Sequence, residues 1–258
     1  MSVFEGPREL RYFYRLNPVS FAMIVIITCV YIAQLISLTI FDVNLIHEGG
    51  IITWNRYIGP AGPFLELNTE FYRFITAIFL HGNFLHYLFN TFFGLFIIGA
   101  SLERLIGSKK YFLTLAIAGL GSSAIVYGWN FVSWEVFGSN SAFVVTIGAS
   151  GAIFGAMGFL FFLTLTRPGW FTPQDISSIR GLILINIIFS FFGNISKSGH
   201  FGGLVMGILA GVLLTSDFPE HRNKAFNNPY NTYGHEDWTL EDITVIDDDD
   251  DDDDRRVW

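Results

Sequence analysis

Long apolar runs separated by short polar segments dominate this chain. About 20 apolar residues in a helix cross the hydrocarbon core of a bilayer, which is about 30 Å thick. The runs predict six membrane-spanning helices, at residues 18–41, 79–100, 110–129, 142–165, 179–193 and 199–216. The fifth run is the shortest, so we expect that helix to be tilted, mobile or partly interfacial. Six spans would leave both ends of the chain on the same side of the membrane.

The composition supports the same class of protein. Of the 258 residues, 51% are hydrophobic and only 15% are charged, whereas about 25% of the residues in a soluble domain are charged. The chain is therefore predicted to be an all-α membrane protein, a six-transmembrane helical bundle. The first run has no small-residue cleavage site and is interpreted as an uncleaved span. Cys29 is the single cysteine, which excludes a disulfide or a Cys-based metal site within one chain.

The Lys and Arg residues indicate how the spans are oriented. If the N-terminus is cytoplasmic, ten of them lie in inner segments near the spans, and Arg56, Arg73 and Lys197 lie in outer loops. This bias satisfies the positive-inside rule. It predicts that both termini lie in the cytoplasm, and the expected location is a prokaryotic plasma membrane. The expected division is an N-terminal segment (1–17), a six-span domain (18–217) and an acidic tail (218–258).

The tail contains an unbroken run of eight Asp at 247–254. A block of like charges repels itself and cannot form a core, so the tail is predicted to be disordered. A solubilising role without a specific partner is the simpler interpretation, while metal or partner binding by the tail stays open.

Four polar side chains fall within or beside the apolar runs. Ser150 and His200 lie near the outer ends of the fourth and sixth runs. His86 and Asn90 lie roughly 10–17 Å into the second run, at 1.5 Å per residue, and share one helix face because they are four residues apart. Taken singly, each residue has a structural alternative, but polar groups at membrane depth are costly and often functional. A serine and a histidine are the minimum components of a hydroxyl nucleophile with a general base, so the matched depths favour a protease working inside the bilayer.

Small residues recur every fourth position on two of these runs. Gly203 and Gly207 follow His200, and Gly151 and Gly155 follow Ser150. Such stripes allow helix backbones to approach closely in lipid. If the two stripes face one another, Ser150 and His200 lie side by side; packing without any catalytic role is the alternative.

Three motifs carry a resemblance to a known family. They are His-x4-His-x3-Asn from His81 to Asn90, Gly-x-Ser-Gly at Gly148-Ala149-Ser150-Gly151, and His-x2-Gly-x3-Gly from His200 to Gly207. In this order and on these runs they resemble the motifs of the rhomboid intramembrane serine proteases. The resemblance covers residues 71–214.

The resemblance implies a role for each candidate residue. Ser150 would be the nucleophile and His200 the general base, forming a dyad without an Asp. The Ser150 backbone N–H and the side chains of His86 and Asn90 would stabilise the oxyanion, as fixed donors do in a water-poor site.

Four further residues are expected to have supporting roles. His81 would order the first loop, and Glu103 resembles a structural acidic residue that follows the second span. Arg73 would correspond to the Arg of an aromatic-Arg pair, here Tyr72-Arg73 in place of Trp-Arg. Phe154 stands where the family often has Tyr, so its ring could stack on the catalytic His but its missing hydroxyl removes any hydrogen bond there.

The expected substrates are membrane-spanning proteins whose helix unwinds locally near the outer face. We expect them to approach laterally beside the fifth span, and the lipid bilayer is the other expected partner. No cofactor, metal or nucleic-acid partner is implied, and the oligomeric state is undetermined. Two other classes are weighed: a catalytically inactive rhomboid-like protein that binds membrane clients, and a channel or small transporter. The inner halves of the spans are almost purely apolar, which disfavours the channel.

Overall fold

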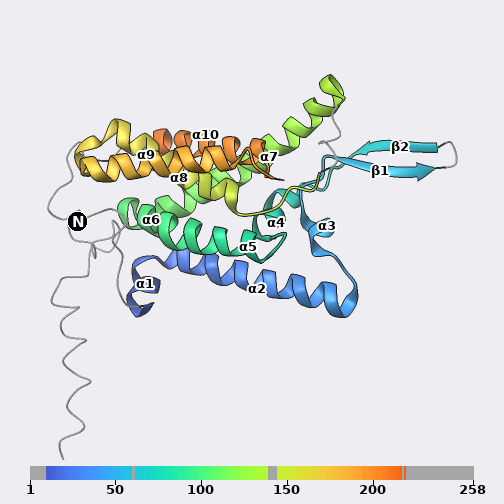
Figure 1. The fold of residues 1–258 in the computed structure, drawn as a ribbon, viewed down its shortest axis with the longest axis horizontal. Coiled ribbons are helices and arrows are strands. Elements are labelled where there is room, and N and C mark those ends of the chain that lie inside the picture. The colour runs from blue at the N-terminus through green and yellow to red at the C-terminus, as the bar shows by residue number, and fades with distance from the viewer. Residues whose placement is uncertain (1–9, 60–61, 139–143, 194, 217, 219–258) are drawn as a thin grey trace, which may run out of the picture.

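The chain folds into a bundle of helices with a β-hairpin that projects from one end, as a computed structural model shows (Figure 1). The structure describes residues 10–59, 62–138, 144–193, 195–216 and 218. The longer helices are α2 (Pro18–Phe41), α7 (Ser108–Phe137), α8 (Ser150–Thr166), α9 (Pro173–Phe189) and α10 (Lys197–Leu214). A further long helix is continuous through α5 (Phe84–Leu88), the π-helical stretch η1 (Phe89–Gly99) and α6 (Ala100–Ile106).

Short elements fill the connections. They are α1 (Leu10–Leu16), α3 (Leu45–Gly49), α4 (Arg73–Phe79) and the 3-10 turn η3 (Pro168–Trp170). Strands β1 (Trp54–Gly59) and β2 (Gly62–Leu67) pair antiparallel between α3 and α4. The helical membrane architecture expected from the sequence is confirmed, and the hairpin is an element that the apolar pattern did not predict.

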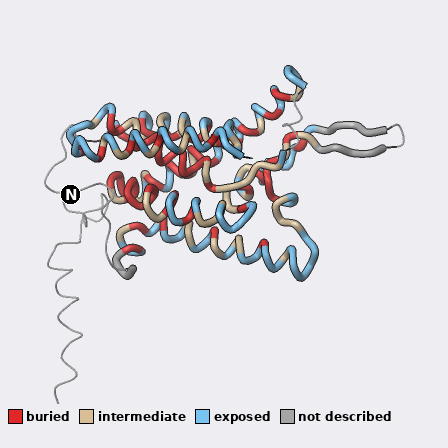
Figure 2. The backbone as a smooth tube through the Cα atoms, viewed as in Figure 1, coloured by how far each residue is buried: buried red, intermediate tan, exposed pale blue. Residues whose placement is uncertain are grey.

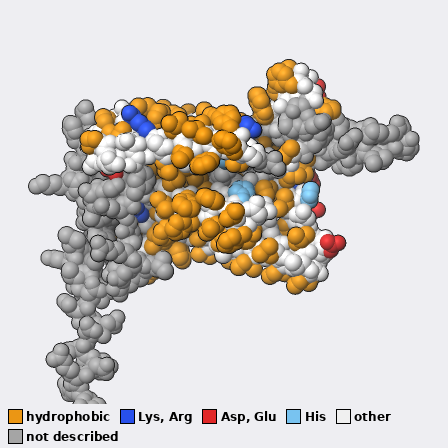
Figure 3. All heavy atoms as spheres, viewed as in Figure 1, with side chains coloured by type: hydrophobic (Ala, Val, Ile, Leu, Met, Phe, Trp, Pro, Cys, Tyr) orange, Lys and Arg blue, Asp and Glu red, His pale blue; other side chains and the backbone are white. Residues whose placement is uncertain are grey.

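Within the described residues, four helices are long and apolar enough to cross a membrane. They are Pro18–Phe41, Phe84–Ile106, Ser108–Phe137 and Lys197–Leu214, while Ser150–Thr166 is apolar but shorter. The six-span count therefore stays a prediction. Large apolar side chains such as Ile32, Leu35 and Leu38 of α2 are about half exposed, and hydrophobic side chains cover most of the described part of the face in Figure 3. Apolar surface of this extent marks contact with lipid or protein rather than water.

Several helix boundaries differ from the predicted runs. The fourth helix begins at Ser150 rather than at 142, because Gly148 has a φ of 117°, which a helix cannot contain. Residues 139–143, which include the first two residues of that run, lie outside the described residues. The fifth helix begins earlier than predicted, at Pro173, where Thr172 and Asp175 form a capping box. The third helix extends to Phe137 and ends at Gly138 in the left-handed conformation.

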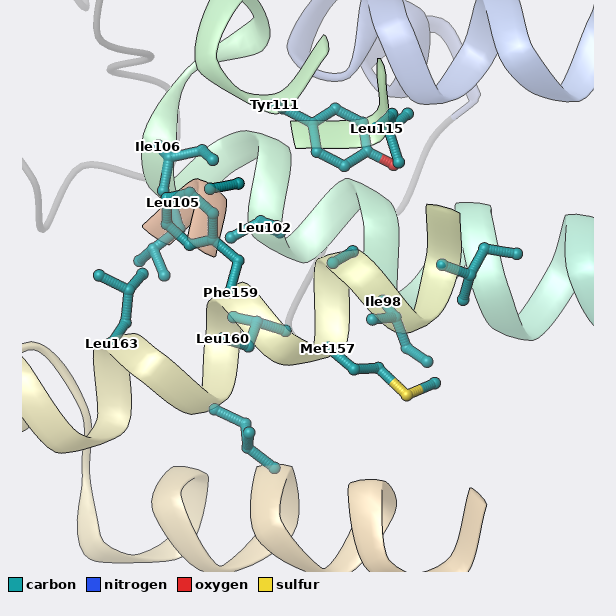
Figure 4. Packing of buried hydrophobic residues seen from close by; sticks show 14 of the residues in the cluster. Ile98, Leu102, Leu105, Ile106, Tyr111, Leu115, Met157, Phe159, Leu160 and Leu163 are labelled. Carbon is teal, nitrogen blue, oxygen red and sulfur yellow. The ribbon is translucent and has the colours of Figure 1, made fainter. Parts of the chain in front are cut away.

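Helix α8 lies at the centre of the bundle. Every residue from 151 to 160 on it is buried, and Figure 2 shows exposed residues along the outer helices around this buried centre. Phe159, Leu160 and Leu163 of α8 pack into a cluster with Leu102 of α6 and Tyr111 of α7 (Figure 4). A helix that is apolar all round is expected to be buried on all sides.

Glycines bring α8 and α10 into backbone contact. A Cβ added at Gly203 would collide with the Gly151 carbonyl, and one added at Gly207 would collide with the Gly155 carbonyl. The two small-residue stripes therefore face one another, as their spacing predicted. No side chain larger than hydrogen fits at these crossing points.

A buried carboxylate joins two helices at the end of the bundle opposite the hairpin. Glu103 of α6 is fully buried and accepts hydrogen bonds from the backbone N–H groups of Val19 (2.9 Å) and Ser20 (2.8 Å) at the start of α2. The first N–H groups of a helix have no partner within the helix, and negative charge is favourable there. Arg104, the next residue, donates to the Asn17 side chain at 3.1 Å. These contacts hold the N-terminal end of α2 against α6.

Replacing Gly207 with Ala should destabilise the bundle. The new methyl group would meet backbone rather than a movable side chain, so α10 would have to separate from α8. Overpacking of this kind costs about 1–3 kcal/mol, and the melting temperature in detergent should fall accordingly. Gly181→Ala on α9 is the matched control, because no atom lies within 4 Å of its added Cβ. Equal melting temperatures for the two variants would contradict the close packing.

Candidate active site

Ser150 is the first residue of α8 and follows a turn that is hydrogen-bonded to two other segments of the chain. The Gly148 N–H donates to the Ala77 carbonyl at 2.8 Å, and Thr146 forms an isolated β-bridge with Ile51. Gly148 supplies the positive φ that the turn requires. Ser150 is partly buried. Its backbone N–H is one of the first-turn donors that have no acceptor within the helix.

His200 lies in the first turn of α10. Its N–H donates to the Ser196 carbonyl at 3.1 Å, and the Ser196 hydroxyl caps the helix by accepting from the Gly199 N–H at 3.2 Å. From α7, the Ser122 hydroxyl donates to the Gly199 carbonyl at 2.8 Å. The start of α10 is thus attached both to its own cap and to a neighbouring helix.

The His200 ring stacks on Phe154, one helical turn after Ser150. The two ring centroids are 4.0 Å apart and the interplanar angle is 21°. Ser150 and Phe154 are four residues apart and share one face of α8. The contact between Gly151 and Gly203 sets the two helix starts at the same level. The structure thus places the His200 ring on the face of α8 that carries Ser150 and Phe154, next to the glycine contact between α8 and α10.

His86 lies against the turn that leads into Ser150. A Cβ added at Gly148 would lie 2.6 Å from His86 Nε2. The Gly82 N–H donates to His86 Nδ1 at 3.3 Å, so Nδ1 is an acceptor and Nε2 of the neutral ring carries the proton. An N–H donor therefore points toward the backbone next to Ser150.

The helix that contains His86 begins later than the predicted run, which starts at residue 79. The helix begins at Phe84, and Asn83 caps it by accepting from the His86 N–H at 2.9 Å, so His86 lies in the first turn. Asn90 lies one turn further on and is buried. The Asn90 amide donates to the His86 carbonyl at 2.8 Å, which uses one of its two N–H donors.

His81 lies behind His86 in the turn before α5. It is 1% exposed, and its ring centroid is 4.9 Å from that of His86. Its backbone forms two hydrogen bonds with the side-chain amide of Gln34 on α2. The His81 N–H donates to Gln34 Oε1 at 3.1 Å, and Gln34 Nε2 donates to the His81 carbonyl at 3.0 Å. These bonds attach the turn that contains His81 to α2. The sequence did not indicate this role for Gln34, which lies within an apolar run.

Arg73 holds the segment between α2 and α4. It is 8% exposed; its Nε donates to the Glu70 carboxylate at 2.7 Å, and its Nη1 donates to the His47 (2.6 Å) and Gly50 (3.0 Å) carbonyls. The hydrogen bond from Arg73 lowers the pKa of the Glu70 carboxyl. Because this pKa is lowered in the folded protein, the pair contributes its full stability at pH values above the pKa of an ordinary Glu. The contribution is lost as the pH falls through the folded-state pKa of Glu70.

Ser190 is another contributor that the sequence motifs did not indicate. It follows the last residue of α9, is 1% exposed, and its Oγ lies 2.6 Å from His200 Nδ1. Nothing in the local sequence pairs these two residues. Among the described residues, no group of three or more His, Cys, Asp or Glu could hold a metal ion.

Comparison with known proteins decides the family. The model of the Rhomboid domain family matches residues 68–217, more than half of the chain. The chain belongs to the rhomboid family. The matched region contains every site residue that the sequence predicted, from Arg73 to His200.

Several relatives within this family are named proteases. The chain is 35% identical over 150 residues to rhomboid protease GluP of Bacillus subtilis (strain 168), covering 56% of this chain and 26% of GluP. It is 27% identical over 201 residues to rhomboid protease GlpG of Salmonella choleraesuis (strain SC-B67), covering 75% of this chain and 62% of GlpG. It is 30% identical over 174 residues to RHOMBOID-like protein 5 of Arabidopsis thaliana, covering 62% of this chain and 52% of that protein. These relatives support a protease at the level of the family, and the apolar helices support an integral membrane protein.

Replacing Arg73 with Lys should loosen the segment between α2 and α4. A single ammonium group cannot reproduce the planar fork by which Arg73 reaches a carboxylate and two carbonyls. We expect faster cleavage of residues 42–72 by an added soluble protease of broad specificity, measured in detergent. Arg180→Lys, at an exposed position of α9, is the control and should behave as the unaltered protein does. Equal cleavage rates for the two variants would contradict the role of Arg73.

Proposed function

We propose that this chain is an intramembrane serine endopeptidase that cleaves transmembrane proteins with a Ser150–His200 dyad. The observation that carries the proposal is the stack of His200 on Phe154, one helical turn after Ser150, where glycines bring α8 and α10 into contact. The membership of the rhomboid family and the proteases named among its relatives support the same reaction.

The reaction proceeds through an acyl-enzyme. The Ser150 Oγ attacks the carbonyl carbon of the scissile peptide bond while His200 accepts the hydroxyl proton. His200 then gives this proton to the leaving amine as the C–N bond breaks. A water molecule, deprotonated by His200, hydrolyses the Ser150 ester and restores the free hydroxyl.

The developing oxyanion is stabilised at the start of α8. The Ser150 N–H is a first-turn donor, and the N-terminus of a helix carries partial positive charge. The Nε2–H of His86 adds a second donor beside this turn, and the free N–H of the Asn90 amide adds a third. Donors held in place before the reaction do not have to reorganise as the charge develops.

The substrate is a membrane-spanning segment that is locally unwound near the outer face. Unwinding is required because helical carbonyl groups are already hydrogen-bonded and shielded by side chains. The proposed orientation sets the end with Arg104 and Glu103 in the cytoplasm, and Ser150 toward the other end, in keeping with the positive-inside rule. In this arrangement 18–217 is a six-span domain of a prokaryotic plasma membrane, flanked by cytoplasmic segments 1–17 and 218–258.

Ser150→Ala and His200→Ala should each abolish cleavage of a single-span substrate. Removing either half of a nucleophile–base pair costs about as much as removing both, on the order of 10⁴–10⁶-fold in kcat. Turnover of a fluorescent substrate in detergent measures the loss, and the melting temperature shows whether the variants remain folded. Ser177→Ala, an exposed serine of α9, is the matched control. Appreciable cleavage by Ser150→Ala would overturn the mechanism.

Labelling with a serine-directed fluorophosphonate separates the protease from an inactive client-binding protein. The unaltered protein should be labelled, and Ser150→Ala should not. A folded protein that binds membrane clients but takes up no label would favour the binding function instead.

Asn90→Ala and His86→Ala should each lower kcat more than they raise KM. Loss of one oxyanion donor costs about 10²–10³-fold in kcat. Steady-state kinetics in detergent measure both constants. If Asn90→Ala left kcat intact, its bond to the His86 carbonyl would be its whole role, as a helix-stabilising contact.

A further inference from the structure

The hydroxyl of Ser190 contacts the imidazole of His200 across two helices. Ser190 follows the last residue of α9, and its Oγ lies 2.6 Å from Nδ1 of His200 on α10. Ser190 is 1% exposed, so water does not compete for this contact. Both residues belong to the matched family region, yet none of the three sequence motifs includes Ser190.

The proton on this contact can be assigned by counting donors. Ser190 Oγ also lies 2.8 Å from the backbone carbonyl of Asn186. A carbonyl oxygen only accepts, and a hydroxyl has a single hydrogen, so the Ser190 hydroxyl donates to Asn186. Its oxygen is then an acceptor toward His200, and the proton between the two side chains belongs to Nδ1. In the neutral ring, Nε2 holds the lone pair.

We propose that Ser190 is a positioning residue that holds His200 in the Nδ1–H tautomer and so leaves Nε2 free to accept the Ser150 proton. The inference rests on the proposed function, in which His200 is the general base. The stack on Phe154 sets the plane of the ring. The hydrogen bond from Nδ1 sets its rotation within that plane, and the two contacts together fix the direction of the lone pair.

The contact also ties the general base to the end of α9. Three consecutive residues after Ser190 are exposed, and large side chains on the outer side of α9, such as Ile185 and Phe189, are about half exposed. If the end of α9 moves to admit a substrate, the Ser190–His200 bond lengthens and the ring is held less firmly. The contact therefore links the orientation of the base to the position of this helix end.

The tautomer can be measured without any substrate. Protein labelled with ¹⁵N-histidine is studied by solid-state NMR in lipid, at a pH where the ring of His200 is neutral, and the His200 signals are identified by their loss in His200→Gln. We expect the proton on Nδ1 in the unaltered protein and a substantial population of the Nε2–H form in Ser190→Ala. A proton on Nε2 in the unaltered protein, or a tautomer ratio that Ser190→Ala does not change, would overturn the inference.

Kinetics supply the second measurement. Ser190→Ala should lower kcat about tenfold, the rate equivalent of one hydrogen bond, and leave KM unchanged because Ser190 does not touch the substrate. The rate of fluorophosphonate labelling should fall by the same factor, since it reports the nucleophilicity of Ser150 without a membrane substrate. Ser190→Thr, which keeps the hydroxyl, should restore most of both rates, and Ser177→Ala is the control for an alanine on α9.

The outcomes separate this inference from the proposed function. Cleavage that persists in Ser150→Ala would overturn the function, whatever tautomer His200 adopts. Loss of cleavage in Ser150→Ala together with unchanged labelling in Ser190→Ala would leave the function in place and overturn the role of Ser190. A change in KM alone in Ser190→Ala would also overturn it, because that change would indicate a contact with substrate.

Discussion

The contact between the backbones of α8 and α10 is the constraint on which the rest of this structure depends. Lipid tails are as apolar as most side chains, so helices in a membrane associate through close packing rather than through the exclusion of water. Gly151 with Gly203, and Gly155 with Gly207, allow the two helices to approach until backbone meets backbone. This approach sets the first turns of both helices side by side, and Ser150 and His200 lie in those turns.

Hydrogen bonds to the backbone hold the two ends of the bundle around this contact. At one end Glu103 binds the N–H groups that begin α2, and at the other Arg73 binds carbonyls of the segment between α2 and α4. Both side chains are removed from water. Glu103 accepts hydrogen bonds from backbone N–H groups, and Arg73 donates hydrogen bonds to backbone carbonyls. A charge buried in this way is acceptable because its hydrogen-bonding capacity is met. These two residues maintain the frame within which the glycine contact lies.

The hydrogen-bond partners of His86 and His200 differ, and these partners decide which ring nitrogen carries the proton. Nδ1 of His86 accepts from a backbone N–H, so its Nε2 is a donor. In the tautomer that we propose for His200, Nδ1 donates to the Ser190 hydroxyl and Nε2 is an acceptor. A donor suits a group that stabilises negative charge, and an acceptor suits a general base. In the proposed mechanism, one imidazole of the site is a donor and the other is an acceptor at the same pH.

The sequence by itself determined the class of the protein and most of the candidate residues. Apolar length predicts helices that cross a membrane, and four-residue spacing predicts the facing glycine stripes, because both are local properties of a helix. Helix starts were less well predicted: Ser150 begins α8 only because Gly148 adopts a positive φ, which the apolar run did not signal. Tertiary structure alone decided the partners of Arg73, the bond between Gln34 and His81, and the contact of Ser190 with His200. These hydrogen bonds join residues on different elements, and their geometry follows from how the helices pack rather than from any pattern along the chain.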